Sequence, residues 1–494
     1  MAQELSVVLG AVAAVLLLSV LAVRVSVRLG FPSLVLYLAI GVLLGEAGIG
    51  IQFENAALTE SLGLAALVLI LTEGGLTTRW SEVRAAFWPG VVLSTVAVAV
   101  SIAVTGVALH WILGLDWRIA FLWGAVLAST DAAAVFSVLR NISVGRRLVG
   151  ALELESGMND AAAYLVVVLL ASGGTASWTD PLLAVYELVV GGLIGVTLGW
   201  AGAHALRRSA LPATGLYPLA TVAVTVLAFS AGSFVHASGL LAAYLAALVL
   251  GNAKLPHRND TLSFAEGLGW LSQIGLFVLL GLFMSPNRLL DAVVPGLVAG
   301  LVVTFLARPI SVAVSLTPFR VPWREQAFLS WAGLRGAVPI VLAMIPLTEG
   351  VPDAERLVDA VFVLVIVLTI VQGSTLPLIS RWLGLAKPGE TREVDVDAAP
   401  LDELGAVLLT FTVPKGSKMH GVYLSELRLP AGATVSLLVR DGVGHTPGSS
   451  TRVQEHDQLL VVATEQVRSA TERRIRAVDR AGRFARWRGE TGED

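Results

Sequence analysis

The sequence predicts an all-α polytopic membrane protein with about thirteen transmembrane helices, followed by a small cytoplasmic α+β domain. Hydrophobic residues make up 55% of the 494 residues and charged residues only 14%, whereas soluble globular proteins carry about 25% charged residues. Apolar runs of about 20 residues, long enough to cross a bilayer as helices, alternate with short polar turns up to residue 385. Beyond Lys387, apolar and polar residues alternate over short segments, which is typical of strands.

The membrane domain is expected to span residues 1–385. Its first apolar run has no basic segment before it, so a retained helix is expected and not a cleaved signal peptide. Lysine and arginine collect in alternate loops, so the positive-inside rule places the N-terminus outside and the C-terminal domain in the cytoplasm. The protein is expected in the inner (plasma) membrane of the cell. The runs lie near residues 4–23, 31–49, 59–78, 88–113, 119–139, 147–172, 181–206, 215–235, 238–252, 267–285, 289–316, 325–347 and 357–380.

The rest of the chain divides into three parts by composition. Residues 386–400 are a charged linker, residues 401–478 hold the expected strands, and residues 479–494 are a basic tail. The tail interleaves arginines with Phe484 and Trp487, which suits either contact with anionic lipid or a solvated terminal helix. The strands are predicted at residues 406–413, 434–442 and 457–464.

Composition also excludes several functions. The chain has no cysteine, which excludes disulfides, thiolate metal sites and a cysteine nucleophile, and its seven histidines match no metal-ligand spacing. The acids within the apolar runs have no histidine or cysteine beside them, so an enzyme active site is not expected. Neither a resident cofactor nor a nucleic-acid partner is expected.

The first polar interruption of an apolar run is "VLASTDAAAVF", which contains Ser129, Thr130 and Asp131. Serine and threonine side chains bond backbone carbonyls and open a membrane helix, and the carbonyl oxygens exposed in this way can bind a cation. Asp131 is therefore either a cation ligand or a buried partner of a distant arginine.

The second interruption is "LESGMNDAAAYLVVVLL". Ionised carboxylates persist inside a bilayer only where they are paired, buried in protein or beside a water-filled path. At helical spacing Glu155 and Asn159 share one face, while Ser156 and Asp160 share a face about 100° away. We interpret Glu155 as the structural partner of a basic residue, and Asp160, with the Ser156 hydroxyl beside it, as a group that binds the cation or proton.

The third interruption is "WAGLRGAVPIVLA", in which Arg335 lies between Gly333 and Gly336, so this helix too is expected to be kinked or unwound. Arg335 is expected to neutralise Glu155 and to donate to the amide oxygen of Asn159, since a guanidinium carries five donors. Two interrupted helices, one early and one late, indicate a transporter site between structural repeats.

Two other ionisable residues in the apolar runs have alternative interpretations. Arg308, in "FLARPISVAV", is either a structural or helix-end residue or an accessory to the site. Glu73, in "LILTEGGLTTRW", lies near the cytoplasmic end of its run, where it either extends to the interface or lies on the cation pathway.

Asp131, Asp160, Ser156 and the Thr130 carbonyl supply only oxygen ligands with at most two formal charges, which suits a partly dehydrated alkali cation or protons. A carboxyl group removed from water retains a proton more readily, so the same carboxylates can hold either a cation or a proton and thereby couple two fluxes. The alternative is a cation channel or channel-like uniporter gated by the cytoplasmic domain. A potassium channel would need a TVGYG-like filter, which the sequence lacks.

The motifs "ASTDAAAVF", "ESGMNDAAAYL", "GLLAAYLAALVLGN", "WLSQIGLFVLLGLFMSP", "ARPISV" and "WAGLRGAVPIVLA" resemble the monovalent cation:proton antiporter family, in its electroneutral branch, across essentially the whole membrane region. The resemblance implies thirteen helices in two inverted repeats, with two crossing unwound helices. It also implies a homodimer in which a moving core works by elevator-like alternating access.

The resemblance assigns roles to single residues. It implies that Asp131 and Asp160 are the cation and proton carboxylates, that Ser156 and Thr130 complete the shell, and that Glu73 lies near the ion. It implies a structural pair of Glu155 and Arg335 that also holds Asn159. Because Asn159 stands where electrogenic relatives would have a second aspartate, one cation is expected to exchange for one proton.

Residues 401–478 look like the C-terminal half of a regulator-of-potassium-conductance domain (TrkA-C-like), through "GVYLSELRLP", "VRDG" and "DQLLVV". No GxGxxG turn precedes them, so the nucleotide-binding half is expected to be absent. The resemblance implies regulation by dimerisation or by a small ligand, and antiporters with this half resemble potassium/proton exchangers more than sodium-specific ones. The residues themselves leave potassium and sodium open.

Overall fold

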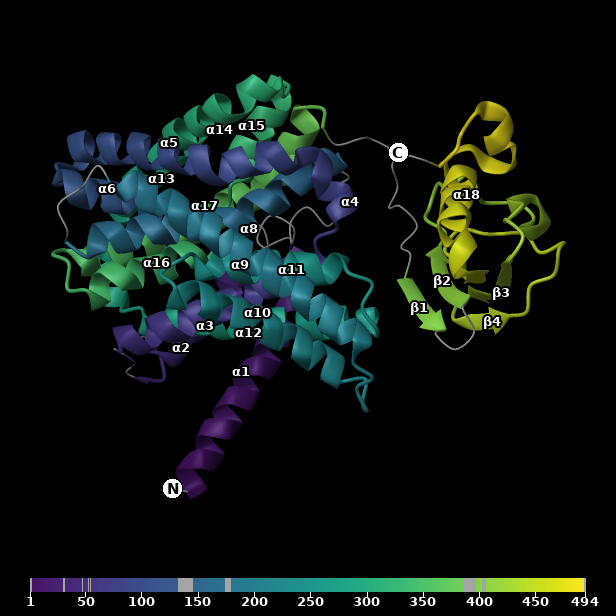
Figure 1. The fold of residues 1–494 in the computed structure, drawn as a ribbon, viewed down its shortest axis with the longest axis horizontal. Coiled ribbons are helices and arrows are strands. Elements are labelled where there is room, and N and C mark those ends of the chain that lie inside the picture. Colours follow the sequence, from purple (N-terminus) through teal and green to yellow (C-terminus); the bar gives the residue numbers. More distant parts are fainter. Residues whose placement is uncertain are drawn as a thin grey trace. The chain divides into compact units, whose positions relative to one another are not determined.

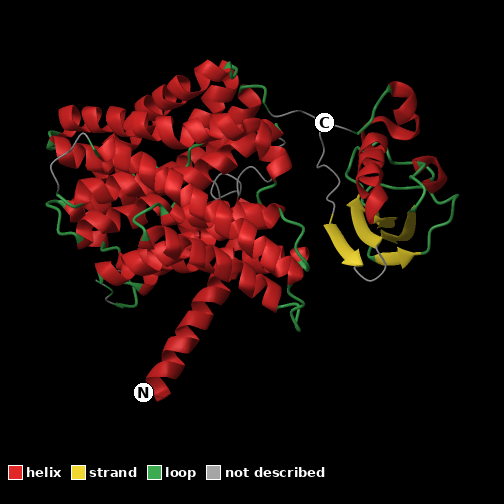
Figure 2. Ribbon diagram, in the orientation of Figure 1, coloured by secondary structure: helices red, strands yellow, loops and turns green. Residues whose placement is uncertain are grey.

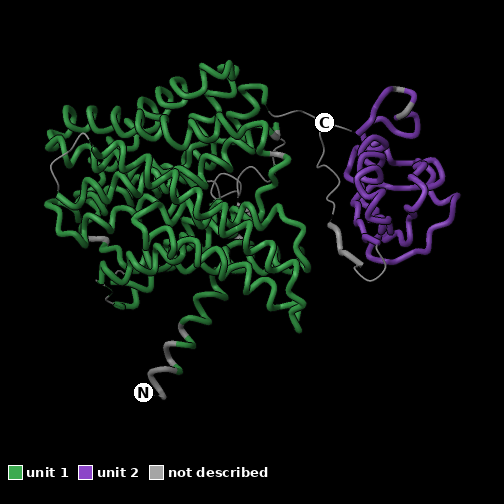
Figure 3. The backbone as a smooth tube through the Cα atoms, in the orientation of Figure 1, with its two compact units in different colours: residues 1–386 green, residues 387–494 purple. Residues whose placement is uncertain are grey.

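The computed structural model describes residues 2–29, 32–46, 48–51, 53, 55–131, 145–173, 179–385, 397–401 and 406–492. The chain forms two compact units, residues 1–386 and residues 387–494 (Figure 3). All described elements of the first unit are helices, whereas the second unit holds the described strands (Figure 2). Each unit is described by itself.

The first unit is one bundle of helices (Figure 1). Between its long helices lie the short helix α4 (Trp80–Val83), a 3-10 turn (Arg84–Ala86) and a π-helical segment, η2 (Val303–Ala307). The other helices are α1 (Ala2–Leu29), α2 (Ser33–Leu44), α3 (Ala56–Thr77), α5 (Phe87–Leu113), α6 (Trp117–Val126), α8 (Arg146–Ala171), α9 (Asp180–Arg208), α10 (Leu216–Phe234), α11 (Gly239–Asn252), α12 (Arg258–Phe283), α13 (Pro286–Val302), α14 (Arg308–Leu316), α15 (Trp323–Ala332), α16 (Ala337–Thr348) and α17 (Ala354–Trp382).

The prediction of a polytopic helical membrane protein is confirmed. Among the described residues, eight helices are long and apolar enough to cross a bilayer, and α15 with α16, bent by 56° at a short break, can form a ninth span. The remaining apolar helices are shorter: Val12–Arg24, Ser33–Leu44, Trp117–Val126 and Gly239–Asn252. Each of the thirteen predicted runs contains one of these segments, although residues 132–139 of the run 119–139 lie outside the described part of the chain. Within the described residues nine of the runs meet the length and composition of a membrane span, so the count of thirteen transmembrane helices stays a prediction.

Small residues allow the helices of the bundle to pack closely. A Cβ atom added at Gly41 of α2 would lie 2.2 Å from the carbonyl oxygen of Val278 in α12. One added at Gly195 of α9 would lie 2.5 Å from the carbonyl oxygen of Ala242 in α11. Lipid tails are as apolar as leucine side chains, so such close backbone packing, and not hydrophobic burial, holds membrane helices together.

Both segments that were predicted to interrupt a helix are non-helical where the structure describes them, and they meet. Helix α6 ends at Val126, and residues 333–336 separate α15 from α16. The backbone N–H of Asp131 donates to the carbonyl oxygen of Leu334 at 2.8 Å, which joins the two non-helical segments. The residues that follow Asp131, 132–144, lie outside the described part of the chain.

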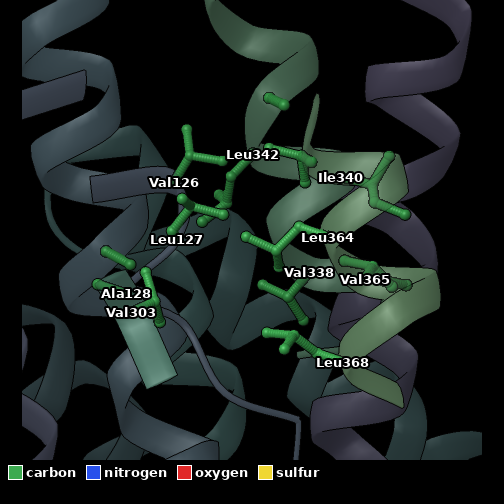
Figure 4. Packing of buried hydrophobic residues seen from close by; sticks show 14 of the residues in the cluster. Val126, Leu127, Ala128, Val303, Val338, Ile340, Leu342, Leu364, Val365 and Leu368 are labelled. Atoms are coloured by element: carbon green, nitrogen blue, oxygen red, sulfur yellow. The ribbon is translucent and has the colours of Figure 1, made fainter. Parts of the chain in front are cut away.

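A buried apolar core surrounds this meeting point. Side chains from the end of α6, such as Val126 and Leu127, belong to one cluster with Val338 and Leu342 of α16 and Leu364 of α17 (Figure 4). Each of them is less than 7% exposed. The interrupted backbone is therefore enclosed by protein, where exposed peptide groups do not face lipid.

The second unit confirms the predicted α+β domain. Its antiparallel sheet has the order β1-β2-β5-β3-β4, and its inner face packs against α18 (Arg468–Ala481) through Ile475 and Val478. Three of the strands were predicted, and β1 and β4 were not. The strands are β1 (Asp397–Leu401), β2 (Ala406–Thr412), β3 (Ala433–Arg440), β4 (Val443–His445) and β5 (Gln458–Thr464).

One buried carboxylate stabilises the turn before β5. Asp457 is fully buried and accepts two hydrogen bonds from Arg440, each 2.8 Å long, and another from the backbone N–H of Gln454 at 2.7 Å. These bonds raise the pKa of the Arg440 guanidinium above its usual value. The pair ties the end of β3 to the start of β5.

Candidate cation site at the two broken helices

Helix α8 contributes four polar side chains from two adjacent turns, Glu155, Ser156, Asn159 and Asp160, to the centre of the bundle. Glu155, Asn159 and Asp160 are 1%, 0% and 4% exposed, although the helix continues into a run of valine and leucine. Burial of charged groups at this depth is tolerated only with protein partners or a water-filled path. The surroundings of each side chain therefore decide its role.

Two side chains of α8 hold the break of α6 in place. Ser156 donates its hydroxyl hydrogen to the carbonyl oxygen of Thr130 at 2.9 Å. Asn159 donates from Nδ2 to Oγ1 of Thr130 at 2.6 Å. Thr130 is 4% exposed, so both bonds form away from solvent. They bring the non-helical backbone before Asp131 against the face of α8 that carries Ser156 and Asp160.

Asp131 lies against the second break as well. A Cβ atom added at Gly336 would lie 1.7 Å from Oδ2 of Asp131, so the carboxylate occupies the space that the missing side chain leaves. Together with the backbone bond from Asp131 to Leu334, this contact places one acid between both interrupted helices. The glycine is required here for close approach.

A cavity of about 210 Å³ joins the predicted site residues. Asp131, Ser156, Asp160 and Glu73 all line it, which brings residues from α3, α8 and the break of α6 together. Within the described part of the chain, the buried Oδ1 atom of Asp160 has no hydrogen-bond partner. A buried carboxylate oxygen without a donor is costly, so this atom is where a proton or a cation would be stabilised.

The cavity also contains residues that the sequence analysis missed. Glu153, one turn before Ser156 on α8, is one of them, and the others come from α11 and α12. The three on α12 follow one another at spacings of four and three, which places them on one helical face. That spacing of polar residues in an apolar run was the available signal. The residues missed are Glu153, Tyr244, Glu266, Trp270 and Gln273.

Tyr244 of α11 lines the cavity and packs directly against α8. It is 1% exposed, and a Cβ atom added at Gly157 would lie 2.3 Å from its ring. Its hydroxyl donates to the carbonyl oxygen of Glu153 at 3.4 Å. Gly157 therefore lets α11 approach α8 directly beside Ser156.

The predicted partner of Glu155 was wrong. Its carboxylate is bound by the guanidinium of Arg308 through two hydrogen bonds, one from Nη1 and one of 2.9 Å from Nη2. Arg308 also donates to the carbonyl oxygen of Leu329 at 3.3 Å. It is 5% exposed and follows directly on the π-helical segment η2. Arg308, whose role the sequence left open, is the structural partner of Glu155.

Arg335 occupies a different position from the one predicted. It lies in the unwound segment before α16 and donates from Nη1 to the carbonyl oxygen of Gly333 at 3.3 Å. Within the described residues, its Nε and Oδ1 of Asn159 are both buried without a partner, so the expected bond between Arg335 and Asn159 is also wrong. The reason is geometric: Arg308 presents both Nη atoms to the carboxylate in the paired geometry that favours arginine, whereas Arg335 is directed by the unwound backbone.

Arg335 still contributes to the electrostatics of the site. It is 1% exposed and close enough to Asp160 to interact with it. Because Arg308 is already neutralised by Glu155, Arg335 offers a positive charge that offsets the buried acids Asp131 and Asp160. The cavity is therefore rich in oxygen atoms: Asp131, Asp160 and the Ser156 hydroxyl line it, and so do three glutamates, Glu73, Glu153 and Glu266. The Arg335 guanidinium lies within electrostatic reach of Asp160.

A fold with two broken helices that meet beside buried ionisable groups defines a secondary transporter. Residues 13–382 match the family model described as sodium/hydrogen exchanger, transmembrane, and residues 408–476 match the TrkA-C domain. The chain belongs to the sodium/hydrogen exchanger family of monovalent cation:proton antiporters and carries a TrkA-C domain. Both resemblances found in the sequence are thereby confirmed.

Curated relatives match along nearly the whole chain. A K(+)/H(+) antiporter NhaP of Alkalimonas amylolytica is 36% identical over 487 residues, covering 95% of this chain and 84% of that protein. A K(+)/H(+) antiporter NhaP2 of Shewanella sp. (strain MR-4) is 35% identical over 461 residues, covering 91% and 79%. The sodium proton antiporter MjNhaP1 of Methanocaldococcus jannaschii, solved at pH 8, has a similar fold, with a TM-score of 0.69 at 22% identity over 78% of this chain and all of that one.

Proposed function

We propose that the protein exchanges one K⁺ for one H⁺ across the cell membrane, with Asp131 and Asp160 binding the cation and the proton competitively. The observation that carries the proposal is the buried, unpartnered Oδ1 of Asp160 in a cavity that Asp131 and Ser156 also line, within the described residues. The two curated potassium/proton antiporters, whose similarity extends through the C-terminal domain, support K⁺ as the cation.

In the cation-bound state, the carboxylates of Asp131 and Asp160 replace part of the hydration shell of K⁺. The Ser156 hydroxyl gives its hydrogen to Thr130, so towards a cation in the cavity it acts as an oxygen ligand and not as a donor. The Thr130 carbonyl can accept both from Ser156 and from a cation, since a carbonyl oxygen has two lone pairs. Glu73, at the cavity wall, adds negative charge that attracts cations towards the site.

When the cation leaves, a proton replaces it on the same carboxylates. The charge of the site is then unchanged, because one positive charge has replaced another beside Arg335. Asn159 is neutral and bonded to Thr130, so this position adds no further proton-binding acid. Each cycle therefore carries one cation in one direction and one proton in the other, and net charge movement is zero.

Alternating access is proposed to expose the site first to one side and then to the other. The cavity extends to Thr77 and Thr78 at the C-terminal end of α3, which the charge pattern of the loops places on the cytoplasmic side. At the other end of α3, Thr348 of α16 donates to the carboxylate of Glu60. In this proposal the arrangement is the inward-open state, the N-terminus lies outside, and two copies form the working homodimer.

Proteoliposomes with an internal pH dye test the proposal. We expect an outward K⁺ gradient to drive proton uptake, and Asp160→Asn to abolish it. Glu349→Gln, which changes an exposed carboxyl outside the cavity, serves as the matched control. Exchange at the normal rate by folded Asp160→Asn would contradict the assignment of this carboxylate.

The same vesicles test separately which cation is transported, with what stoichiometry, and whether the protein is a channel. Sodium and lithium gradients at several pH values test the cation, and exchange driven by Na⁺ but not by K⁺ would leave antiport intact and refute K⁺. Clamping the membrane potential tests stoichiometry, because a one-for-one exchange should not respond to it. A potassium conductance without proton flux would favour the channel alternative.

A further inference from the structure

An apolar groove of about 140 Å³ lies between α13 with η2 on one side and α17 on the other, away from the candidate cation site. Within the described part of the chain, no polar atom is exposed in its lining. Trp331 of α15 closes one side of it. The groove has no role in the proposed exchange of cation and proton, so what it binds is a separate question.

Two features of the sequence produce the groove. Gly296 and Gly300 stand one turn apart on α13, and the first lets the helix approach α17, because a Cβ atom there would lie 2.7 Å from the Ala360 carbonyl oxygen. At Gly300 the same added atom would lie 3.6 Å from Leu364, which is ordinary contact, so space remains beside it. Directly beyond, η2 widens the helix by one residue per turn.

The groove opens to the bilayer. Leu301, Phe305 and Val371 line it and are 57%, 63% and 46% exposed, although they belong to membrane-spanning segments. Exposed side chains at this depth face acyl chains and not water. An apolar depression in such a surface loses dispersion contacts unless an apolar chain fills it.

Positive charge stands at the ends of α15 and α17 that the charge pattern of the loops places on the cytoplasmic side. Arg324 near the start of α15 and Arg381 at the end of α17 are both exposed. A Cβ atom at Gly384 would lie 3.6 Å from Nη1 of Arg324, which places this guanidinium beside the turn that follows α17. Trp323 and Trp382 are 66% and 81% exposed next to the two arginines. Exposed tryptophan with basic residues is typical of side chains at headgroup level.

The distance between the charges and the groove fits one lipid. Ten residues of α17 separate Val371 from Arg381, which is about 15 Å at the helical rise of 1.5 Å per residue. Half the hydrocarbon thickness of a bilayer is also about 15 Å. A lipid whose headgroup lies at Arg324 and Arg381 therefore has the ends of its acyl chains level with the groove.

We propose that an anionic phospholipid of the cytoplasmic leaflet binds on this face, with its phosphate between Arg324 and Arg381 and one acyl chain in the groove between α13 and α17. The bound lipid holds α13, α15 and α17 together at their bilayer side. The site depends on the membrane location of the helices and not on which cation is transported.

The full-length protein, purified and reconstituted in nanodiscs of phosphatidylglycerol mixed with phosphatidylcholine, provides the test. Native mass spectrometry then measures the excess of phosphatidylglycerol retained after detergent exchange. We expect Arg324→Gln with Arg381→Gln to lower this retention by about 30-fold, the change expected when two basic groups lose their attraction to an anionic headgroup. Gly300→Leu, which fills the groove, should lower retention while both arginines remain.

Matched controls use the same substitutions elsewhere. Arg208→Gln removes an exposed arginine at the end of α9, and Gly275→Leu adds a leucine at a position of α12 with open space around it. Neither should change lipid retention. Should Gly300→Leu fail to fold, Val371→Phe fills the groove from its opposite wall. Transport and melting temperature are measured for every variant to confirm folding.

Three results would overturn the proposal. Unchanged phosphatidylglycerol retention in the folded double arginine variant would remove the headgroup site. Equal stabilisation by inorganic phosphate or glycerol phosphate would indicate a simple anion site and not a lipid site. A change of oligomeric state in Gly300→Leu with unchanged lipid retention would identify the groove as a contact between copies of the chain.

Discussion

Glu155 is a buried carboxylate whose desolvation is offset by one specific partner, Arg308. Its carboxylate is 1% exposed and receives two hydrogen bonds from Arg308, which is itself 5% exposed. A Cβ atom at Gly333 would lie 2.6 Å from Nε of Arg308, so the break of the other helix makes room for this guanidinium. The pair therefore stabilises the fold beside the cation site and does not itself need to bind the ion.

A double-mutant cycle tests this pairing. Removing one partner of a buried ion pair leaves an uncompensated charge and costs about 3–5 kcal/mol of unfolding free energy. We expect Glu155→Gln and Arg308→Met each to lower the melting temperature markedly, and the two together to cost less than their sum. The same cycle between Glu155→Gln and Arg335→Met should show a smaller coupling, because the two hydrogen bonds of the Glu155 carboxylate come from Arg308. Strong coupling to Arg335 in place of Arg308 would contradict the pairing.

Gly336 tests the position of Asp131. An alanine Cβ at this position would lie 1.7 Å from Oδ2 of Asp131, so the carboxylate must move out of its place in the cavity. We expect Gly336→Ala to lose most exchange activity in vesicles while its melting temperature stays near that of the unmodified protein. Gly267→Ala, on α12 with no atom within 4 Å of the added carbon, is the control and should transport normally. Full activity in Gly336→Ala would show that Asp131 does not need this space.

Among the helices, α3 and α16 contact each other beside the candidate cation cavity, and the proposed alternating-access movement is expected to change this contact. A Cβ atom at Gly63 of α3 would lie 3.6 Å from Cβ of Val341 in α16, and the hydrogen bond between Thr348 and Glu60 joins the same two helices near one end. Helix α16 carries the second break next to Asp131, whereas α3 carries Glu73. Relative sliding of these helices would change access to the cavity.

Cysteine cross-linking tests this movement without interference from other thiols, because the chain has no native cysteine. The distance of 3.6 Å at Gly63 and Val341 suits a disulfide. We expect oxidised Gly63→Cys with Val341→Cys to stop exchange and reduction to restore it.

A second cysteine pair serves as the control for the cross-link. Gly202→Cys with Val224→Cys joins α9 to α10 at a comparable 3.4 Å, away from the cavity. This cross-link should leave transport unaffected. Normal exchange in the oxidised α3–α16 pair would show that the two helices do not move apart during the cycle.

As a whole, the molecule consists of a membrane unit and a separately packed C-terminal unit. The C-terminal unit has its own buried core, including Leu409, Phe411 and Val461, which are all fully buried, and its own buried ion pair at Asp457. A domain with its own core can be removed without unfolding the remainder. The expected role of the C-terminal unit is therefore regulation and not ion binding.

Truncation after Leu385 tests that role. We expect the shortened protein to exchange K⁺ for H⁺ in vesicles, because every described residue that lines the candidate cation cavity precedes this position. Its dependence on pH or on cation concentration should differ from that of the full chain. Arg440→Gln in the full chain, which leaves Asp457 buried without its partner, should shift regulation in the same direction. Failure of the truncated protein to insert and fold would instead make the domain structural.

The sequence analysis grouped Asp131, Ser156 and Asp160, because charges and hydroxyls inside apolar runs have few roles in a bilayer, and the three residues line one cavity. That they bind the cation and the proton stays a prediction. The partner of Glu155 was assigned to Arg335, since both arginines lie in apolar runs and linear spacing cannot show which one reaches a distant carboxylate. That choice depends on η2 and on the space beside Gly333, and both are properties of packed helices.

The number and approximate limits of the apolar runs, both helix interruptions, the strands β2, β3 and β5 and the side of the C-terminal domain follow from composition, periodicity and charge alone. These properties are local, and the bilayer enforces them on each segment separately. Tertiary structure decided which charges pair, that Glu153, Tyr244 and Glu266 join the cavity, and that a groove opens between α13 and α17. Contacts between helices far apart in the chain depend on how closely their backbones approach and how each helix is rotated, and neither is a property of any single segment.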